Sequence, residues 1–348
     1  MAVFTYSPYE VALLSGVGAF GAIVPAVAVW LLLRNVPSRI QLPPRPTLRD
    51  VPGNGGGLRQ YRVRYVAIST AVFGDRCFLK MSDVPGPYGS LSHCYSTQDE
   101  EHAGRPTLRI DICGPAKDEH SAVETHADSA RAFLPILSLS ANAAVGEVRF
   151  SELLAEDTTA EPGGIVKLDP RYDANRILDP EAAGELLDAV YGHPQRARII
   201  NALREYQLAL RYVGRGRQTP VLAHLHRAML ITADAYTESF CIQRKCRLDQ
   251  LAKSFGVATL DLSCHILRTM VYNDDQSHVA IASEAYSRFF EIPHPEHVAH
   301  WVTYPATPNS VTTVAAYARN ALFALLGIDE KYRGRLCAES YLVPLGLA

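Results

Sequence analysis

Histidine is the residue type in this chain whose spacing most directly suggests chemistry. His294, His297 and His300 stand three residues apart, and on a helix this spacing brings neighbours to one side. A zinc hydrolase would place Glu directly after the first His, in the H-E-x-x-H arrangement, and would need a further ligand. No such Glu follows, and Pro293 and Pro295 interrupt the segment. We therefore expect ordinary surface or interface histidines and no metal site.

The other chemically suggestive patterns are incomplete. Cys241 and Cys246 are separated by four residues without a second cysteine pair, which favours structural thiols. His224 and His226 begin a long predicted helix, but a turn of about 100° per residue points them in different directions. The sequence contains no nucleophile elbow, Walker loop or paired-carboxylate motif. A familiar hydrolase or nucleoside triphosphatase is therefore not supported.

Three glycines near the N-terminus match a cofactor fingerprint. Gly16, Gly18 and Gly21 spell G-x-G-x-x-G, which marks dinucleotide-binding folds. Such a fold needs an amphipathic helix after the glycines and an acidic residue about 20 positions on. Here Pro25 interrupts the segment, its faces are all apolar, and residues 36–44 contain no acid. We therefore predict no dinucleotide cofactor, and no other motif implies one.

The same glycines lie in a stretch without charge, residues 11–33, which is followed directly by Arg34. A helix rises about 1.5 Å per residue, so this stretch is long enough for the ~30 Å core of a bilayer. A cleaved signal peptide would have basic residues before a shorter apolar run, and buried helices of globular cores are seldom this long and uncharged. The sequence therefore predicts a single transmembrane helix. Arginines follow it and none precedes it, which places the bulk of the chain in the cytoplasm.

Small residues form a stripe along this predicted membrane helix. Gly18, Ala22 and Ala26 recur every four residues, a spacing that permits close helix packing in lipid. Homodimerisation, or docking on a partner in a membrane complex, would use this stripe. The plainer interpretation is that glycine is simply common in membrane helices.

Composition limits the partners of the remaining chain. The 348 residues carry a formal net charge of only -2, so no overall field attracts nucleic acid, and charge does not support RNA as a partner. The seven cysteines are odd in number and lack a short repeated spacing. That pattern suits reduced thiols in a cytosolic body.

Periodicity divides the chain into five predicted parts. They are a short extracytoplasmic N-terminus (1–10), the membrane helix (11–33), a Pro/Gly-rich linker (34–58), a small α+β region (59–168) and a helical bundle (169–348). Alternation in YRVRYVAIS predicts a half-buried strand from residue 61, and further strands are expected over 76–81, 107–113 and 145–150. A helix over 119–144 should kink or break near Pro135. Apolar spacings of three and four predict bundle helices over 194–213, 219–246, 260–271, 279–290 and 312–326.

The helical half resembles a known family. The resemblance is carried by the runs ALREYQLALRY (202–212), ILRTMVYNDDQSHVAIASEAYSRFFE (266–291) and AYARNALFALLGIDEKYRGRL (316–336) and by the long helix over 221–237. These segments resemble uncharacterised bacterial proteins with a domain similar to HEPN, the higher eukaryote and prokaryote nucleotide-binding family. The resemblance covers residues 180–348 through the order and texture of the helices. It implies a bundle of four to six helices, often homodimeric, found in defence and toxin contexts.

The resemblance also implies where a site would lie. Active members of the family cut RNA with an Arg and a His that are separated by four to six intervening residues. Arg268 occupies the matching place, but Asn273, Asp274 and Asp275 fill the His positions. If Arg268 acts, its guanidinium beside Asn273 and Asp274 either holds a phosphate or pairs with the carboxylate. The internal pair is favoured because it satisfies both groups without a ligand.

These observations lead to one expected function and two alternatives. Because no catalytic constellation is complete, we expect a membrane-anchored protein whose HEPN-like domain acts by binding, as a sensor or assembly element. The first alternative is a membrane-tethered ribonuclease with a divergent site near Arg268. The second is a structural subunit of a membrane complex.

Overall fold

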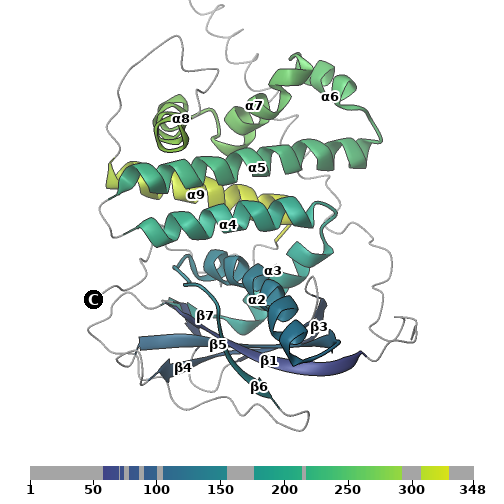
Figure 1. Ribbon diagram of the computed structural model, residues 1–348. Helices are drawn as coiled ribbons and strands as arrows, with labels where there is room; N and C mark the ends of the chain where they lie inside the picture. The colour runs from purple at the N-terminus through teal and green to yellow at the C-terminus, as the bar shows by residue number, and fades with distance from the viewer. Residues whose placement is uncertain are drawn as a thin grey trace, which may run out of the picture. The chain divides into compact units, whose positions relative to one another are not determined.

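A computed structural model of the chain describes residues 58–69, 71–73, 78–85, 90–99, 105–154, 176–213, 217–291 and 307–328. Residues Gly53–Ala348 belong to one compact unit, in which stacked helices cover a face of an antiparallel sheet (Figure 1). The five-stranded sheet has the order β3-β4-β5-β1-β6. Its strands are β1 (Arg59–Ile68), β3 (Phe78–Pro85), β4 (Ser90–Asp99), β5 (Arg105–Ala116) and β6 (Arg149–Leu154). Two short strands, β2 (Ala71–Phe73) and β7 (Arg176–Leu178), pair in parallel beside it.

The predicted alternation in β1 is confirmed on the face that packs against helix α2 (Glu119–Ala141). Val63, Tyr65 and Ala67 are buried there, and the Tyr65 hydroxyl donates a hydrogen bond of 2.6 Å to the α2 carbonyl of Val123. The opposite face of β1 holds Arg64, which lies directly across from Asp111 of β5. This cross-strand carboxylate keeps the arginine side chain buried rather than in solvent.

Helix α2 begins with a capping box. Asp118 accepts a hydrogen bond from the Ser121 backbone at 2.7 Å, while the Ser121 hydroxyl accepts one from the Asp118 backbone at 3.1 Å. The helix does not break at Pro135, as the sequence had suggested it could, but continues to Ala141. It ends at Asn142, whose side chain accepts a buried hydrogen bond of 2.6 Å from Tyr206. That bond joins α2 to the helical layers.

The helical layers match most of the predicted bundle segments. They comprise α3 (Pro180–Gly192), α4 (Arg196–Tyr212), α5 (Gln218–Arg244), α6 (Leu248–Phe255), η2 (Thr259–Asp261), α7 (Leu262–Ile266), the π-helix η3 (Leu267–Val271), α8 (Gln276–Phe290) and α9 (Pro308–Leu326). Helix α4 lies between α2 and α5, and α5 packs in turn against α8 and α9 (Figure 1). One hydrophobic core runs continuously from Val63 in the sheet to Ile328 after α9.

The predicted membrane-anchored fold class is corrected to a mainly helical fold with a small antiparallel sheet. Among the described residues, no helix is both long and apolar enough to cross a membrane. The two longest, α2 with 23 residues and α5 with 27, each carry four charged residues, which are costly within a bilayer. The expected span over 11–33, with Gly18, Ala22 and Ala26, lies outside the described residues, as do residues 1–10 and 34–57. The single-pass and cytoplasmic assignments, the membrane complex and the membrane tether depended on that span and are withdrawn.

One core side chain predicts a dependence of stability on pH. His126 of α2 is 0% exposed, and in the described part of the chain neither ring nitrogen has a hydrogen-bond partner. Burial lowers its pKa from the ordinary value of 6.5. Below that pH the unfolded chain binds a proton that the folded protein does not, so stability falls as the pH drops from about 6.5 toward the lowered pKa.

We expect His126→Leu to reduce this loss and to raise the free energy of unfolding at neutral pH by roughly 1–2 kcal/mol, because an apolar side chain replaces an unpaired polar one. Urea denaturation above and below the pKa of free histidine measures both effects. His120→Leu, at a side chain that is 84% exposed on the same helix, is the matched control. An unchanged pH dependence in His126→Leu would contradict the prediction.

Candidate functional site

The residues predicted from the sequence lie within and just after a π-helical turn. Arg268 lies within η3, and Asn273 and Asp274 follow it with left-handed φ values of 50° and 61°. The backbone N–H of Asp274 donates to the Arg268 carbonyl at 2.8 Å. Both π-helical turns and left-handed residues other than glycine are frequent at functional sites. The backbone of this turn therefore has two features that are frequent at functional sites.

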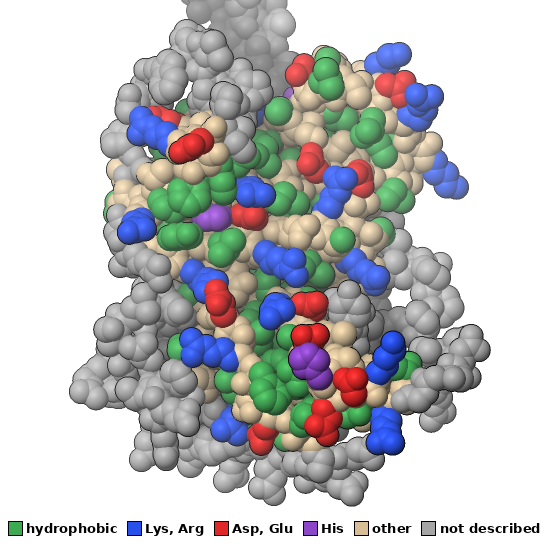
Figure 2. Space-filling model, in the orientation of Figure 1, with side chains coloured by type: hydrophobic (Ala, Val, Ile, Leu, Met, Phe, Trp, Pro, Cys, Tyr) green, Lys and Arg blue, Asp and Glu red, His purple; other side chains and the backbone are tan. Residues whose placement is uncertain are grey.

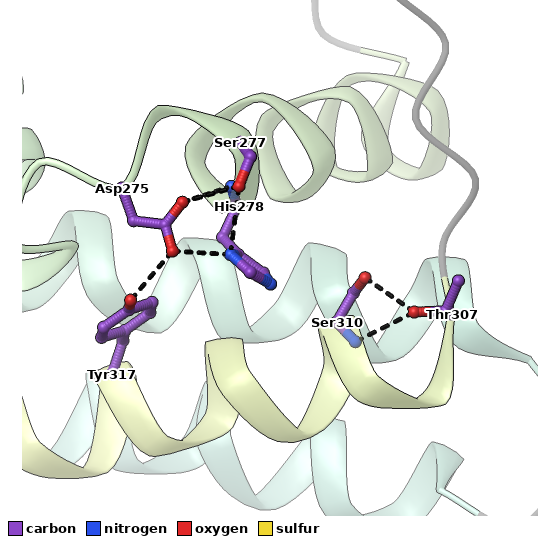
Figure 3. Close-up of polar contacts among 6 residues, drawn as sticks. All are labelled: Asp275, Ser277, His278, Thr307, Ser310 and Tyr317. Atoms are coloured by element: carbon purple, nitrogen blue, oxygen red, sulfur yellow. Dashed lines mark hydrogen bonds and ion pairs between the residues drawn. The ribbon is translucent and has the colours of Figure 1, made fainter.

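Asp275 follows Asp274 and is the N-cap residue of helix α8 (Figure 3). Its Oδ1 accepts hydrogen bonds from the Ser277 hydroxyl at 2.7 Å and from the backbone N–H of His278 at 3.2 Å. Its Oδ2 accepts one from the Tyr317 hydroxyl of α9 at 2.9 Å and lies 2.7 Å from Nδ1 of His278. Burial alone would raise the pKa of Asp275, but these hydrogen bonds hold it well below its usual range. Asp275 is therefore ionised at neutral pH.

The neighbouring His278 is oriented by this carboxylate. An ionised carboxylate only accepts hydrogen bonds, so we assign the proton of the neutral ring to Nδ1, which leaves Nε2 as an acceptor. The His278 side chain is 22% exposed, and Nε2 has no hydrogen-bond partner among the described residues. Burial and the bond to Asp275 raise the pKa of Tyr317, so its hydroxyl stays a donor. An imidazole held this way has the geometry of a general base.

A second set of polar contacts is buried around His226. His226 of α5 is 0% exposed, with Nδ1 2.7 Å from the Tyr272 hydroxyl and Nε2 3.4 Å from the Ser283 hydroxyl. Burial raises the pKa of Tyr272 well above its ordinary value, so the phenol stays protonated in this contact. His224 instead contacts Glu205 of α4 at 2.8 Å. The two histidines have different partners, as their angular separation predicted.

A groove between α2 and β6 was not foreseen from the sequence. It has a volume of about 440 Å³. It is lined by Tyr65, Val123, Glu124, Ala127, Asp128, Arg131, Val148 and Phe150. Phe150 is 50% exposed, and Asp128 pairs with Arg131 at 2.8 Å. A strand over 145–150 was predicted, but its place at the end of the sheet depends on a strand order that local patterns do not encode.

The outer edge of β6 has no partner among the described strands. This strand ends the sheet and pairs with β1 alone among the described strands. Residues 149–152 are exposed, including Phe150, which also lines the groove. An edge strand presents backbone N–H and C=O groups that an additional strand can pair with. The edge and the groove thus form one surface.

Comparison with protein-family models, curated proteins and solved structures finds no match to this chain. The HEPN-like resemblance and the homodimer that it implies therefore stay predictions. Within the described ranges, no group of three or more His, Cys, Asp or Glu side chains is arranged to hold a metal ion. His294, His297 and His300 lie outside those ranges. The two candidate sites are therefore the turn over residues 267–275 that leads into α8, named the α8 turn, and the α2–β6 groove.

Proposed function

We propose that this protein acts by binding an extended peptide segment of a partner, as a sensor or assembly element, and not by catalysis at the α8 turn. The observation that carries the proposal is that, among the described strands, β6 has a partner on one side only and lies beside the groove. In strand addition, backbone hydrogen bonds to a sheet edge supply affinity, and a neighbouring pocket selects alternate side chains. The surface formed by β6 and α2 offers both parts.

The charges of the groove favour a basic side chain in the bound peptide. Two carboxylates, Glu124 and Asp128, face one guanidinium, Arg131, which pairs with Asp128. Glu124 contacts only the exposed ring of His120, at 3.4 Å, among the described residues. A Lys or Arg side chain can lay its apolar stem along the Phe150 ring and bring its charge to Glu124.

The contacts of Asp275 at the start of α8 give this residue a structural role. Both oxygens of Asp275 are engaged in capping α8 and in bonding Tyr317 of α9. A carboxylate with these partners and a lowered pKa holds α8 and α9 together and is a poor proton acceptor. We therefore assign Asp275 to the architecture of the bundle.

A displayed library of random twelve-residue peptides, selected on the purified chain, tests the binding proposal. We expect enrichment of extended sequences that carry Lys or Arg. Fluorescence anisotropy with a labelled enriched peptide should then show at least tenfold weaker binding for Phe150→Ser and a smaller loss for Glu124→Gln.

Matched controls make the result specific to the groove. Leu260→Ser removes a hydrophobic side chain that is 94% exposed on η2, and Glu119→Gln removes an exposed acid of α2 that does not line the groove. Both should bind like the wild type. Equal losses in the test and control variants, or no enriched peptide, would refute the proposal.

Ribonuclease activity is a second candidate, supported by the orientation of His278 by Asp275. Its weakness is charge: on the face seen in Figure 2, Lys and Arg are interspersed with Asp and Glu and form no continuous basic patch. Incubation with a fluorophore–quencher RNA decides between the two candidates. Binding by the groove predicts no cleavage above the level of His278→Ala. Cleavage that both Arg268→Ala and His278→Ala abolish, while His120→Ala retains it, would establish the nuclease instead.

A further inference from the structure

The C-terminus of α5 brings two cysteines together through its backbone cap. The helix ends at Arg244, and Lys245 adopts a left-handed conformation with φ 48°. The N–H of Cys246 then donates to the Cys241 carbonyl at 3.1 Å, and that of Lys245 donates to the Ile242 carbonyl at 3.3 Å. These two bonds define a Schellman cap, in which the side chains at the positions of Cys241 and Cys246 commonly touch.

This cap places Cys246 beside Cys241 in the structure. Burial and the neighbouring Cys246 thiol raise the pKa of Cys241, and both residues are partly exposed. Neither is in a disulfide. Cys94 in the sheet differs, because it is 0% exposed and therefore closed to reagents. Cys241 and Cys246 thus combine adjacent positions in the cap with access to solvent.

We propose that Cys241 and Cys246 form a reversible dithiol–disulfide pair that is oxidised by peroxides. One sulfur, as the thiolate, attacks an oxygen of hydrogen peroxide and breaks the O–O bond, giving a sulfenic acid and hydroxide. The hydroxide takes up the proton that the thiol lost and becomes one water. The other sulfur displaces the hydroxyl from the sulfenic acid, forming the S–S bond and a second water. The two sulfurs together lose two electrons, and the peroxide gains them.

The pair is well placed for this chemistry because its loop is short and already closed by hydrogen bonds. Disulfides require Cα atoms about 4.4–6.8 Å apart, and the cap positions approach each other without unwinding the helix. Burial and the neighbouring thiol raise the pKa of Cys241, which lowers its thiolate fraction at neutral pH, so its oxidation should speed up as the pH rises. The bond would fix the turn that joins α5 to α6. This inference does not depend on the proposed peptide site.

Mass spectrometry of the full chain after peroxide treatment tests the pair. Trypsin cleaves after Arg244, Lys245 and Arg247, so the disulfide links the peptide that contains Cys241 to the dipeptide Cys246-Arg247. We expect this linked species after oxidation and alkylation of the remaining thiols, and its loss on adding dithiothreitol. Oxidation should also raise the melting temperature by roughly 3–5 °C.

Serine variants separate the pair from the other thiols. Cys241→Ser and Cys246→Ser should each abolish both the linked species and the thermal shift, whereas Cys94→Ser and Cys264→Ser should retain them. Oxidation of Cys241 or Cys246 directly to sulfinic acid, or pairing of either one with a different cysteine, would overturn the proposal. So would a pair that stays reduced in the presence of excess peroxide.

Discussion

Replacing Asp111 by Ala is expected to lower the free energy of unfolding by about 3–5 kcal/mol, a large part of the stability of an ordinary domain. The Asp111 side chain is 0% exposed at the centre of the sheet. It accepts hydrogen bonds from Arg64 at 2.8 and 3.2 Å and from Arg62 at 3.1 Å. Without it, Arg64 keeps Glu152 at 2.7 Å, an acid that is 49% exposed and so more strongly screened by water.

The size of this effect follows from the charge that would remain. Burial opposes the charge of Arg64, but hydrogen bonding to Asp111 and its attraction outweigh that effect and raise the pKa of the guanidinium. The arginine cannot escape by losing its proton, so the variant keeps a buried cation with half of its partners. The ring of Tyr95, 5.8 Å from the guanidinium carbon, offers only a weak replacement.

Urea unfolding followed by circular dichroism measures the loss. Asp128→Ala breaks an ion pair whose side chains are 53–58% exposed, and this control should cost below about 1 kcal/mol. The double variant Arg64→Met with Asp111→Leu should recover most of the stability, because it removes charge and partner together. Equal losses for Asp111→Ala and Asp128→Ala would show that the sheet pair contributes no more than a surface one.

Local periodicity was enough to predict the elements that bury one regular face. The alternation of β1 and the stripes of α4 and α5 were recognisable because each places apolar residues at a single repeat. Strand β4 was missed because SLSHCYSTQD is mostly polar and is held by the neighbours on both of its sides. The membrane interpretation relied on residues 11–33 and has no support in the described helices.

The candidate sites depend on pairings that lie far apart in the sequence. The prediction around Arg268 names Asn273 and Asp274, both of which are exposed, and does not name Asp275 as a functional group. The partner that reveals the role of Asp275 is Tyr317, 42 residues later. A capping signal was present in the sequence, since Asp precedes a helix and His follows three residues on. No signal in the sequence indicated the contact of Asp275 with α9.

Asp275→Ala is expected to lower the free energy of unfolding by about 2–3 kcal/mol at neutral pH, because it removes a helix cap and several charge-assisted hydrogen bonds at once. The pKa of Asp275 is lowered in the folded state, so its stabilisation is complete above about pH 4–5 and is lost as the pH falls through and below the ordinary value of 3.8. Wild type and variant should therefore converge in stability toward acid pH. Asp274→Ala, at an exposed neighbour, should have little effect.

Two further variants divide the contribution of Asp275 into its parts. Asp275→Asn keeps a good cap residue but loses the charge, so it should recover part of the stability and abolish the added acid sensitivity. Tyr317→Phe removes only the bond to α9, so hydrogen exchange should speed up where α8 meets α9 while the cap persists. If Asp275 served mainly to orient His278 for catalysis, its loss would abolish RNA cleavage and leave stability nearly unchanged. If Asp275 instead holds α8 and α9 together, its loss lowers stability and does not abolish RNA cleavage, because its hydrogen-bond partners belong to these two helices.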